Sequence, residues 1–422
     1  TPGHERAPTL VLQAHMDMVC EKNADMTFDF SRDAIELERK GDWLTARGTT
    51  LGSDNGIGLA AALAVADDPA VAHGPLEILV TVDEESGLTG AMELDPSLVT
   101  GKRLLNLDTE ELDALYIGCS GGGNSSFTLP LKREAVPSGA RAMELAVTGL
   151  KGGHSGIEIH LQRGNAIRLL ARLLRMCGDE CRVARVDGGN AHNAIPREAH
   201  ALCMVAPANA DAVKRAIQAE AKLIREELAA SDPDVSVSFE PARETPAQVW
   251  TVETSRRVAA LLASLPHGVD AMSADVPGLV ETSSNLAAVR TEDDALNVLI
   301  SVRSSVRSSL LAIRDRASAA AELAGASVVH SDPYPGWKPN LKSEVLRVAQ
   351  RVHKDKLGKD AELKAVHAGL ECGVIGEKVP GIDMISFGPW IESPHSPAER
   401  VNIPSVATFW SFLSALVAEL AS

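Results

Sequence analysis

Acidic and histidine side chains follow short apolar runs at widely separated points of the chain. Residues 9–14, 76–82 and 103–107 are apolar runs, and each is followed within a few residues by an acid or a histidine. Side chains that leave the carboxyl ends of parallel strands gather in one crevice beside the sheet. This pattern predicts an α/β fold with a mostly parallel sheet. Together with two residues in Gly- or Pro-flanked turns, the set comprises His15, Asp17, Asp54, Glu84, Glu85, Asp108 and His395.

The chain of 422 residues is too long for one compact core, so we expect two domains. Residues 118–140 are rich in Gly and Pro and are expected to interrupt the alternation of strands and helices, and the Pro-rich residues 332–339 form a second break. We predict that residues 1–120 and 335–422 build one interrupted domain. Residues 121–334 are expected to form a smaller α+β domain with amphipathic helices and a few alternating strands.

Composition excludes several classes of protein. The net charge of −16 argues against a nucleic-acid partner, because binding phosphates requires clustered Lys and Arg. The six cysteines are scattered without a C-x-x-C pair, which argues against a thiolate zinc site and favours reduced thiols. No apolar run approaches the ~20 residues that span a membrane, and residues 1–10 show no signal peptide. We therefore expect a cytoplasmic location.

The acidic and histidine motifs are interpreted jointly as the ligands of two divalent metal ions. Each motif alone has a simpler explanation, such as a helix N-cap for Asp54 or a surface turn for His395. Their joint occurrence at strand ends favours metal binding. Carboxylates with only two imidazoles suit zinc, manganese or cobalt. The expected arrangement has Asp54 bridging the ions, His15 and Asp108 on one of them, and Glu85 and His395 on the other.

Two pairs of neighbouring side chains indicate what such a centre does. Glu84 and Glu85 are adjacent, so one can hold a metal while the other takes a proton from water. His15 and Asp17 lie two residues apart and face the same side of a strand, so one can ligate while the other orients a neighbouring group. A pair of divalent ions polarises a carbonyl and makes water more acidic, which indicates a hydrolase.

The second domain carries two further candidates. His154 lies in the glycine-rich residues 149–156, which lack the spacing of a phosphate-binding loop. A solvated turn is the simpler explanation for this histidine. Arg303 ends an alternating strand, where it is either a solvated charge or a bidentate clamp for a substrate carboxylate.

Motifs along nearly the whole chain resemble those of the aminoacyl-histidine dipeptidases, also described as Xaa-His or bacterial carnosinase-like dipeptidases. This family lies within the superfamily of paired-zinc aminopeptidases and carboxypeptidases, whose members usually carry several dozen residues before the strand that ends at His15. The matching segments are Ala14–Met18, Gly52–Gly58, Thr81–Gly87, Asn106–Asp108, Gly149–Gly156, Asn193–Glu198, His367–Cys372 and Pro394–Pro397.

The resemblance implies a role for each candidate. Glu84 would be the general base and Asp17 would orient His15, as part of a centre with two zinc ions. His154, Asn193 and Arg303 would meet the substrate, and Gly369 and its neighbours would line the pocket. The substrate would be an unblocked dipeptide, preferentially Xaa-His. The resemblance also implies a homodimer joined through the second domain, in which His154 can serve the site of the other subunit.

Two other functions remain open from the sequence. An amidohydrolase or deacylase of N-acyl amino acids would use the same metal core. A truncated, inactive homologue that survives as a binding module would have lost the metal.

Overall fold

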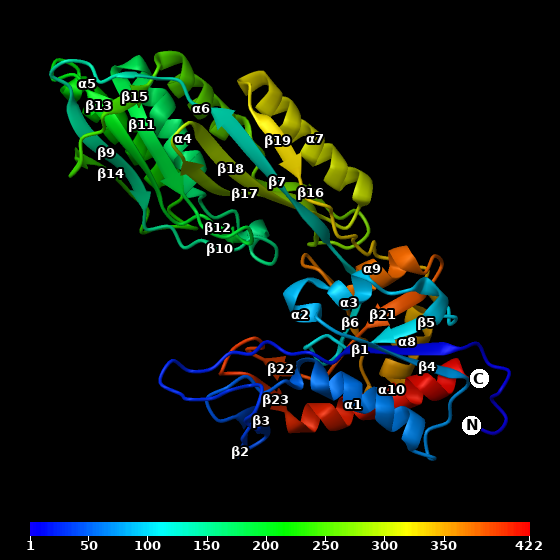
Figure 1. Cartoon of the computed structure of the whole chain (residues 1–422). Helices are drawn as coiled ribbons and strands as arrows, with labels where there is room; N and C mark the ends of the chain where they lie inside the picture. The colour runs from blue at the N-terminus through cyan, green and yellow to red at the C-terminus, as the bar shows by residue number, and fades with distance from the viewer. The chain divides into compact units, whose positions relative to one another are not determined.

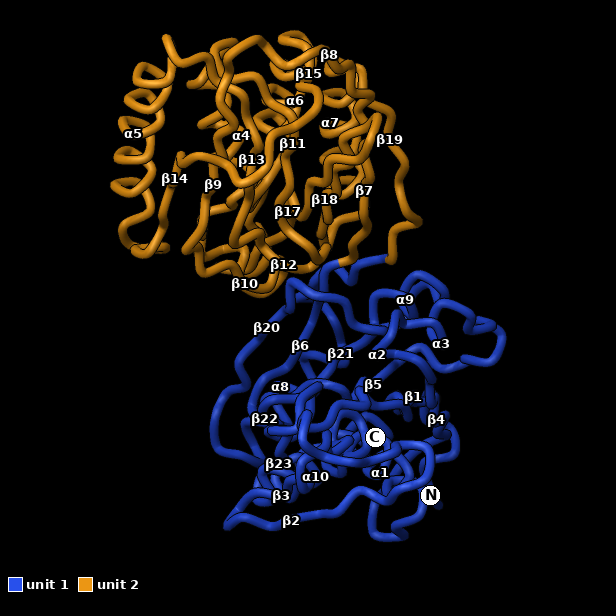
Figure 2. The backbone as a smooth tube through the Cα atoms, turned by 60° about the vertical axis from the view of Figure 1, so that its left-hand side comes forward, with its two compact units in different colours: residues 1–120, 335–422 blue, residues 121–334 orange.

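The structure, a computed structural model, describes residues 1–422 and divides into two compact units. Unit 1 comprises residues 1–120 and 335–422, and unit 2 comprises residues 121–334 (Figure 2). Unit 2 is not the shorter of the two, contrary to the expectation of a smaller second domain. The assignment of the units as catalytic domain and lid remains a prediction.

Unit 1 contains a six-stranded sheet in the order β20-β6-β21-β5-β1-β4 (Figure 1). All neighbouring pairs are parallel except β6 with β21, so the predicted mostly parallel sheet is confirmed. Its strands are β1 (Leu10–His15), β4 (Leu76–Thr81), β5 (Arg103–Asn106), β6 (Ala114–Cys119), β20 (Glu362–Val366) and β21 (Asp383–Ser386).

Strand β1 is buried along its whole length and pairs with β4 on one side and β5 on the other. Its apolar residues Leu10, Val11 and Leu12 supply the burial that fixes a central strand, as expected for parallel sheets covered on both faces. Because all three strands run in the same direction, their carboxyl ends meet at one edge of the sheet.

Helices and a small second sheet complete unit 1. Helix α1 packs against β1 and β4, α8 packs against α10 and β21, and α9 packs against β6 and α3. The helices are α1 (Ser53–Asp67), α2 (Glu84–Gly87), α3 (Thr89–Met92), α8 (Glu344–Leu357), α9 (Glu371–Lys378) and α10 (Ile403–Leu420). The four-stranded sheet has the order β2 (Leu37–Lys40), β3 (Trp43–Ala46), β23 (Arg400–Asn402) and β22 (Ile391–Glu392).

Helix α10 is long and apolar enough to cross a membrane if length and composition alone are considered. The expectation that no apolar run approaches that length is therefore wrong for residues 403–420. Phe409 and Phe412 of this helix are buried and contact the Phe387 ring, with centroids 5.7 and 4.9 Å away. Packing in the core of unit 1 explains the apolar composition of α10.

Unit 2 is built on a nine-stranded antiparallel sheet, in place of the few strands expected. The strands, in the order β14-β9-β13-β11-β17-β18-β7-β19 with β16 also beside β17, are β7 (Gly121–Pro130), β9 (Arg141–Thr148), β11 (Cys181–Gly188), β13 (Ala199–Val205), β14 (Ser236–Pro241), β16 (Gly268–Met272), β17 (Val280–Thr291), β18 (Ala295–Ser304) and β19 (Ser327–His330). Two short pairs are β8 (Arg133–Ala135) with β15 (Gln248–Trp250) and β10 (Gly153–His154) with β12 (Ala194–Ile195).

The helices of unit 2 share one hydrophobic core with this sheet. Helices α4 and α7 contact sheet strands, α6 packs between them, and α5 packs against α4 and β14 (Figure 1). Phe127, Trp250 and Leu286 are fully buried in or beside this core. The helices are α4 (Ala166–Cys177), α5 (Ala210–Glu227), α6 (Val252–Ser264) and α7 (Arg307–Ala324).

The glycine-rich segment after residue 118 is a strand, which contradicts the predicted interruption there. Residues 121–130 form β7, which pairs with both β18 and β19. A Cβ at Gly122 would lie 2.5 Å from the Tyr334 hydroxyl, and one at Gly123 would meet the Arg314 guanidinium. The glycines therefore make room for bulky side chains beside the strand. Because glycines stand where a strand usually has alternating apolar residues, the sequence pattern did not predict β7.

Asn165 caps helix α4 and also ties it to the sheet. Its Oδ1 accepts hydrogen bonds from the backbone N–H groups of Ile167 at 3.0 Å and Arg168 at 3.2 Å. Its Nδ2 donates to the Leu286 carbonyl at 2.9 Å. We expect Asn165→Ala to lower the free energy of unfolding by about 1–3 kcal/mol, because buried backbone groups lose their partners.

Urea denaturation and hydrogen exchange of the α4 amides measure this effect. Asn209→Ala is a matched control, since Asn209 is the N-cap of α5 but makes no side-chain capping bond. That variant is expected to change stability by less than about 0.5 kcal/mol. Equal losses in the two variants would contradict the role given to Asn165.

Candidate metal centre and active site

His15 ends strand β1 and lies at the centre of the candidate site. The side chain is 1% exposed. Its Nε2 lies 3.4 Å from Asp54 Oδ1 and 3.1 Å from Asp108 Oδ1. Asp54 stands at the start of α1, and Asp108 follows β5 by two residues. The end of strand β5 and the start of helix α1 thus bring two of the predicted side chains within reach of one imidazole.

His395 approaches the same aspartate from the other end of the chain. Its Nε2 lies 3.2 Å from Asp54 Oδ2 and 3.0 Å from Glu85 Oε2. The two carboxylate oxygens of Asp54 therefore face different imidazoles, His15 on one side and His395 on the other. This geometry has the form expected of a bridging carboxylate with one ligand set on each side.

The donor set suits divalent cations. His15, Asp54 and Glu85 each offer a ligand atom within 4.8 Å of the others. Glu85 Oε1 is buried without a hydrogen-bond partner, as a carboxylate oxygen intended for a cation would be. Oxygen and imidazole donors without sulfur match zinc, manganese or cobalt. The residues present therefore fit a metal centre.

The electrostatics of the cluster favour positive charge. Burial lowers the pKa of His15, but hydrogen bonds to Asp108 and Asp54 outweigh burial and raise the pKa to about 12. Hydrogen bonds to Asp54 and Glu85 raise the pKa of His395 to about 10. Burial opposes ionisation of Asp54, yet hydrogen bonds from the two imidazoles bring its pKa to about 2. A site that stabilises cationic imidazoles so strongly also attracts metal cations.

Glu84 differs from its neighbour Glu85 in its surroundings. Burial, followed by the negative charge of Asp108, raises the pKa of Glu84 to about 9. Proton transfer is the chemistry that needs such a group, since a carboxylate with raised basicity accepts a proton more readily. The structure thus places beside the ligand cluster a carboxylate that is suited to act as a base.

Asp17 contacts the site through both its backbone and its side chain. The backbone carbonyl of Asp17 lies 3.0 Å from His15 Nδ1, closer than its carboxylate at 3.5 Å. The carboxylate accepts hydrogen bonds from the backbone N–H of Glu84 at 3.1 Å and of Glu85 at 3.2 Å. Asp17 therefore helps to orient His15 and also fixes the start of the segment that carries both glutamates.

A chain of buried polar side chains lies beneath the ligands, and sequence reasoning missed it. Glu371 Oε2 accepts hydrogen bonds from Gln13 Nε2 and Thr81 Oγ1, both at 2.6 Å. Gln13 in turn accepts a hydrogen bond from Asn106, which also accepts one from Ser386. The network joins β1, β4, β5 and β21 across the sheet. A polar residue inside an apolar run, such as Gln13, was the available signal.

The candidates of unit 2 lie close to one another. Strand β10 pairs with β12, so that His154 stands opposite Ala194, the residue after Asn193. The Ser155 backbone N–H donates to the Asn193 carbonyl at 2.8 Å. His154 is half-buried, and its Nδ1 accepts hydrogen bonds from the backbone N–H groups of Gly156 and Ile157 at 3.1 and 3.0 Å. These contacts hold His154 within its own turn, and its role at a substrate site stays a prediction.

Arg303 is not a solvated charge. The side chain is 8% exposed, and its Nη1 donates to the Tyr334 hydroxyl at 3.0 Å. Its Nε is buried without a hydrogen-bond partner. Burial, and after it the charge of Arg303, lowers the pKa values of His154 and His192. These residues form one cluster within unit 2, with a buried cationic group that has unused donor capacity.

Gly369 belongs to unit 1, in the loop that joins β20 to α9. The adjacent Ala368 carbonyl accepts a hydrogen bond from the Ser120 backbone N–H at 3.0 Å. Glu371, two residues further on, reaches the polar network under the metal ligands. A role for Gly369 in lining the substrate pocket stays a prediction.

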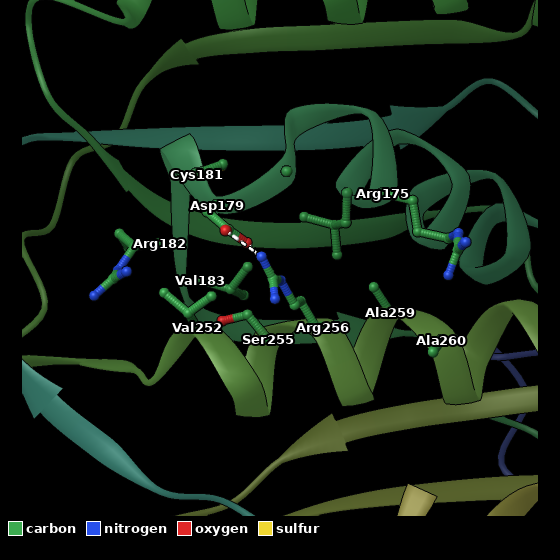
Figure 3. A pocket seen from close by; sticks show the side chains of 12 residues that line it. Arg175, Asp179, Cys181, Arg182, Val183, Val252, Ser255, Arg256, Ala259 and Ala260 are labelled. Atoms are coloured by element: carbon green, nitrogen blue, oxygen red, sulfur yellow. Dashed lines mark hydrogen bonds and ion pairs between the residues drawn. The ribbon is translucent and has the colours of Figure 1, made fainter. Parts of the chain in front are cut away.

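A cavity of about 470 Å³ in unit 2 contains none of these candidates. Arg175, Arg182 and Arg256 line it, but their guanidinium groups do not converge, and Arg256 pairs with Asp179 across its middle (Figure 3). An anion-binding site requires converging donors. The cavity is therefore not a second candidate site.

Comparison with known proteins extends these observations to the whole chain. A model of the Peptidase family M20/M25/M40 matches residues 11–419. The cytosol non-specific dipeptidase of Escherichia coli (strain K12) is 39% identical over 422 residues, which cover 100% of this chain and 87% of that protein. The crystal structure of an aminoacylhistidine dipeptidase from Vibrio alginolyticus is 41% identical, with a TM-score of 0.93, and covers 99% of this chain and 85% of that chain.

A more distant structure shares only the fold. Aminopeptidase PepT from Bacillus cereus ATCC 10987 is 17% identical with a TM-score of 0.54, covering 99% of this chain and 82% of that chain. The fold class and the resemblance inferred from the motifs are confirmed by these matches. Because the family match spans almost every residue from strand β1 to helix α10, the chain belongs to the peptidase family M20/M25/M40.

Proposed function

We propose that the protein is a cytoplasmic, metal-dependent dipeptidase that hydrolyses unblocked dipeptides, including Xaa-His dipeptides. The observation that carries this proposal is the placement of the Asp54 oxygens against His15 and His395, each with a further carboxylate beside it. Two full-length relatives, named as a cytosol non-specific dipeptidase and an aminoacylhistidine dipeptidase, support the substrate class and the location.

The family is metal-dependent, and in this proposal the ligand cluster would hold two ions. Asp54 would bridge them, with His15 and Asp108 on one and Glu85 and His395 on the other. Zinc is the preferred candidate, and cobalt or manganese would also suit these donors. When bound, the ions supply Lewis-acid polarisation of the scissile carbonyl and make a water molecule more acidic.

Glu84 moves the proton in this proposal. Its carboxylate takes a proton from the attacking water and passes it to the nitrogen of the leaving amine. The charge of nearby cations would offset the raised pKa that burial and Asp108 give to Glu84. Asp17 holds the backbone of Glu84 and Glu85, so that the base and a ligand keep their relative positions.

The residues of unit 2 would bind the substrate. Both backbone hydrogen bonds to His154 end on Nδ1, which therefore acts as the acceptor, and a neutral ring carries its proton on Nε2. With its pKa lowered by burial and Arg303, His154 is a neutral donor suited to a developing oxyanion. Arg303 would hold the free carboxylate of a dipeptide through its unused donor, and Asn193 would supply a further polar contact.

A substrate panel tests the proposal. We expect the purified zinc-loaded protein to hydrolyse Xaa-His and other free dipeptides, and to lose activity when a chelator removes the metal. N-acetyl amino acids measured in parallel test the deacylase alternative. Faster turnover of the N-acetyl compounds than of every dipeptide would reject the dipeptidase. Fewer than one bound ion per chain after zinc loading would indicate an inactive binding module.

Glu84→Gln tests the division of roles between the adjacent glutamates. The variant keeps nearly the same shape but cannot accept the proton, so we expect kcat to fall by roughly 10²–10⁴-fold with metal content unchanged. Glu85→Gln, its matched control, is expected to lower metal content as well. Metal analysis and steady-state kinetics on both variants decide the matter. Loss of metal in Glu84→Gln would contradict its assignment as the base.

A homodimer joined through unit 2 is a further part of the proposal. Helix α7 and the neighbouring edge strand β19 expose Leu323 and Val329, apolar side chains of a kind often covered by a partner. Light scattering coupled to size-exclusion chromatography is expected to give twice the mass of the chain. A monomer of full activity would exclude any contribution of His154 to the site of another subunit.

A further inference from the structure

The Glu399 carboxylate accepts hydrogen bonds from four consecutive residues that lead into a metal ligand. Glu399 is 2% exposed and lies four positions after His395. Its Oε2 accepts from the backbone N–H of Leu51 at 2.7 Å and of Gly52 at 3.0 Å. Its Oε1 accepts from Ser53 N at 2.8 Å, Ser53 Oγ at 2.6 Å and Asp54 N at 3.3 Å. One carboxylate thus binds every residue of the segment 51–54.

This carboxylate accepts hydrogen bonds from the backbone of the segment that leads into α1, in which Asp54 and Asn55 have non-helical backbone angles. The N-cap residue of α1 is Gly52, which has φ 77° and no side chain to accept hydrogen bonds from the first turn. The simpler explanation of Asp54 as the N-cap of this helix is wrong, because Gly52 holds that position and no side-chain capping bond forms. Glu399 supplies both the acceptor atoms and the negative charge that favour a helix N-terminus. Because Asp54 makes no cap of its own, its carboxylate is left to face the two imidazoles.

The segment that carries His395 is held by the same residue. The Glu399 backbone N–H donates to the Ser396 carbonyl at 3.0 Å, and Thr45 Oγ1 donates to the Glu399 carbonyl at 2.7 Å. His395 itself has φ 59°, a left-handed conformation that a non-glycine residue adopts only when its surroundings hold it there. Glu399 therefore anchors one end of this turn on the loop that ends at Asp54.

We propose that Glu399 is a positioning residue that fixes His395 against Asp54 Oδ2 and so prepares the ligand set of the second ion. The inference deepens the proposed function and rests on its two-ion centre. His15 ends strand β1, Asp108 follows strand β5, and neither is a hydrogen-bond partner of Glu399, so their ion should depend on Glu399 much less. Residues that orient metal ligands in this way typically contribute 10–100-fold to metal affinity.

The test compares Glu399→Gln with Glu392→Gln as a matched control. The amide introduced by Glu399→Gln would present an NH₂ group to backbone N–H donors, whereas Glu392 lies on the same segment, pairs with Arg400 and does not contact residues 51–54. Calorimetric titration of the metal-free proteins with zinc or cobalt gives the affinity of each ion. We expect Glu399→Gln to weaken the second ion by roughly 10–100-fold and to leave the first nearly unchanged, with Glu392→Gln like the wild type.

Cobalt absorption spectra identify which ion is lost. The spectrum of Glu399→Gln with one equivalent of cobalt should match that of His395→Ala and differ from that of His15→Ala. Hydrogen exchange of the amides of residues 51–54 in metal-free protein tests the hydrogen bonds to Glu399 directly. We expect faster exchange in Glu399→Gln. If Glu399→Gln does not fold, Ser53→Ala removes one donor and should weaken the second ion in the same direction.

The outcomes separate this inference from the proposed function. Wild-type protein that binds two ions but hydrolyses no dipeptide would reject the proposed function. Metal affinity and amide exchange would still test the positioning role of Glu399. Unchanged affinity for both ions in Glu399→Gln would overturn the inference, as would an equal loss of both, because the residue would then support the fold without positioning the second ligand set.

Discussion

The assembly of the site depends on the contacts of the Asp54 carboxylate with two imidazoles. His15 comes from the first strand and His395 from a turn near the end of the chain, and each meets a different oxygen of Asp54. A single carboxylate can hold both only if the two ends of the polypeptide fold into one unit. Unit 1 meets this requirement, because residues 1–120 and 335–422 share one sheet. The intervening residues 121–334 are accommodated as a separate unit with its own core.

Burying polar groups beneath the site is tolerated where they are paired with one another. The polar chain from Ser386 through Asn106 and Gln13 to Glu371 satisfies side chains that would otherwise cost several kcal/mol each inside the sheet. Glu399 does the same for the backbone N–H groups of residues 51–54, which lead into α1. Some atoms are left without partners, among them Glu85 Oε1, which belongs to a group of side chains able to hold a metal ion.

Local sequence patterns predicted the strands and helices that are determined by residues close to them in the chain. The apolar run before His15 became β1, and the apolar run at residues 76–82 became β4. Patterns failed where the environment is not local. Strand β2 is polar and largely exposed, so it has no alternation to detect, and the glycines of β7 fit against Tyr334 and Arg314, which arrive from the far end of unit 2. The cap of α1 failed for the same reason, since Glu399 lies near the other end of the chain.

The sequence alone could predict the types of residue at the site and the strands that end at His15 or shortly before Glu84 and Asp108. Apolar runs and the acids that follow them are adjacent in the chain. The mostly parallel sheet could be predicted in the same way. Folding in three dimensions was needed to place Asp54 Oδ1 against His15 and Oδ2 against His395. These are relations between segments that meet only after folding. Distance and orientation decide ligation and proton transfer, and a linear pattern contains neither.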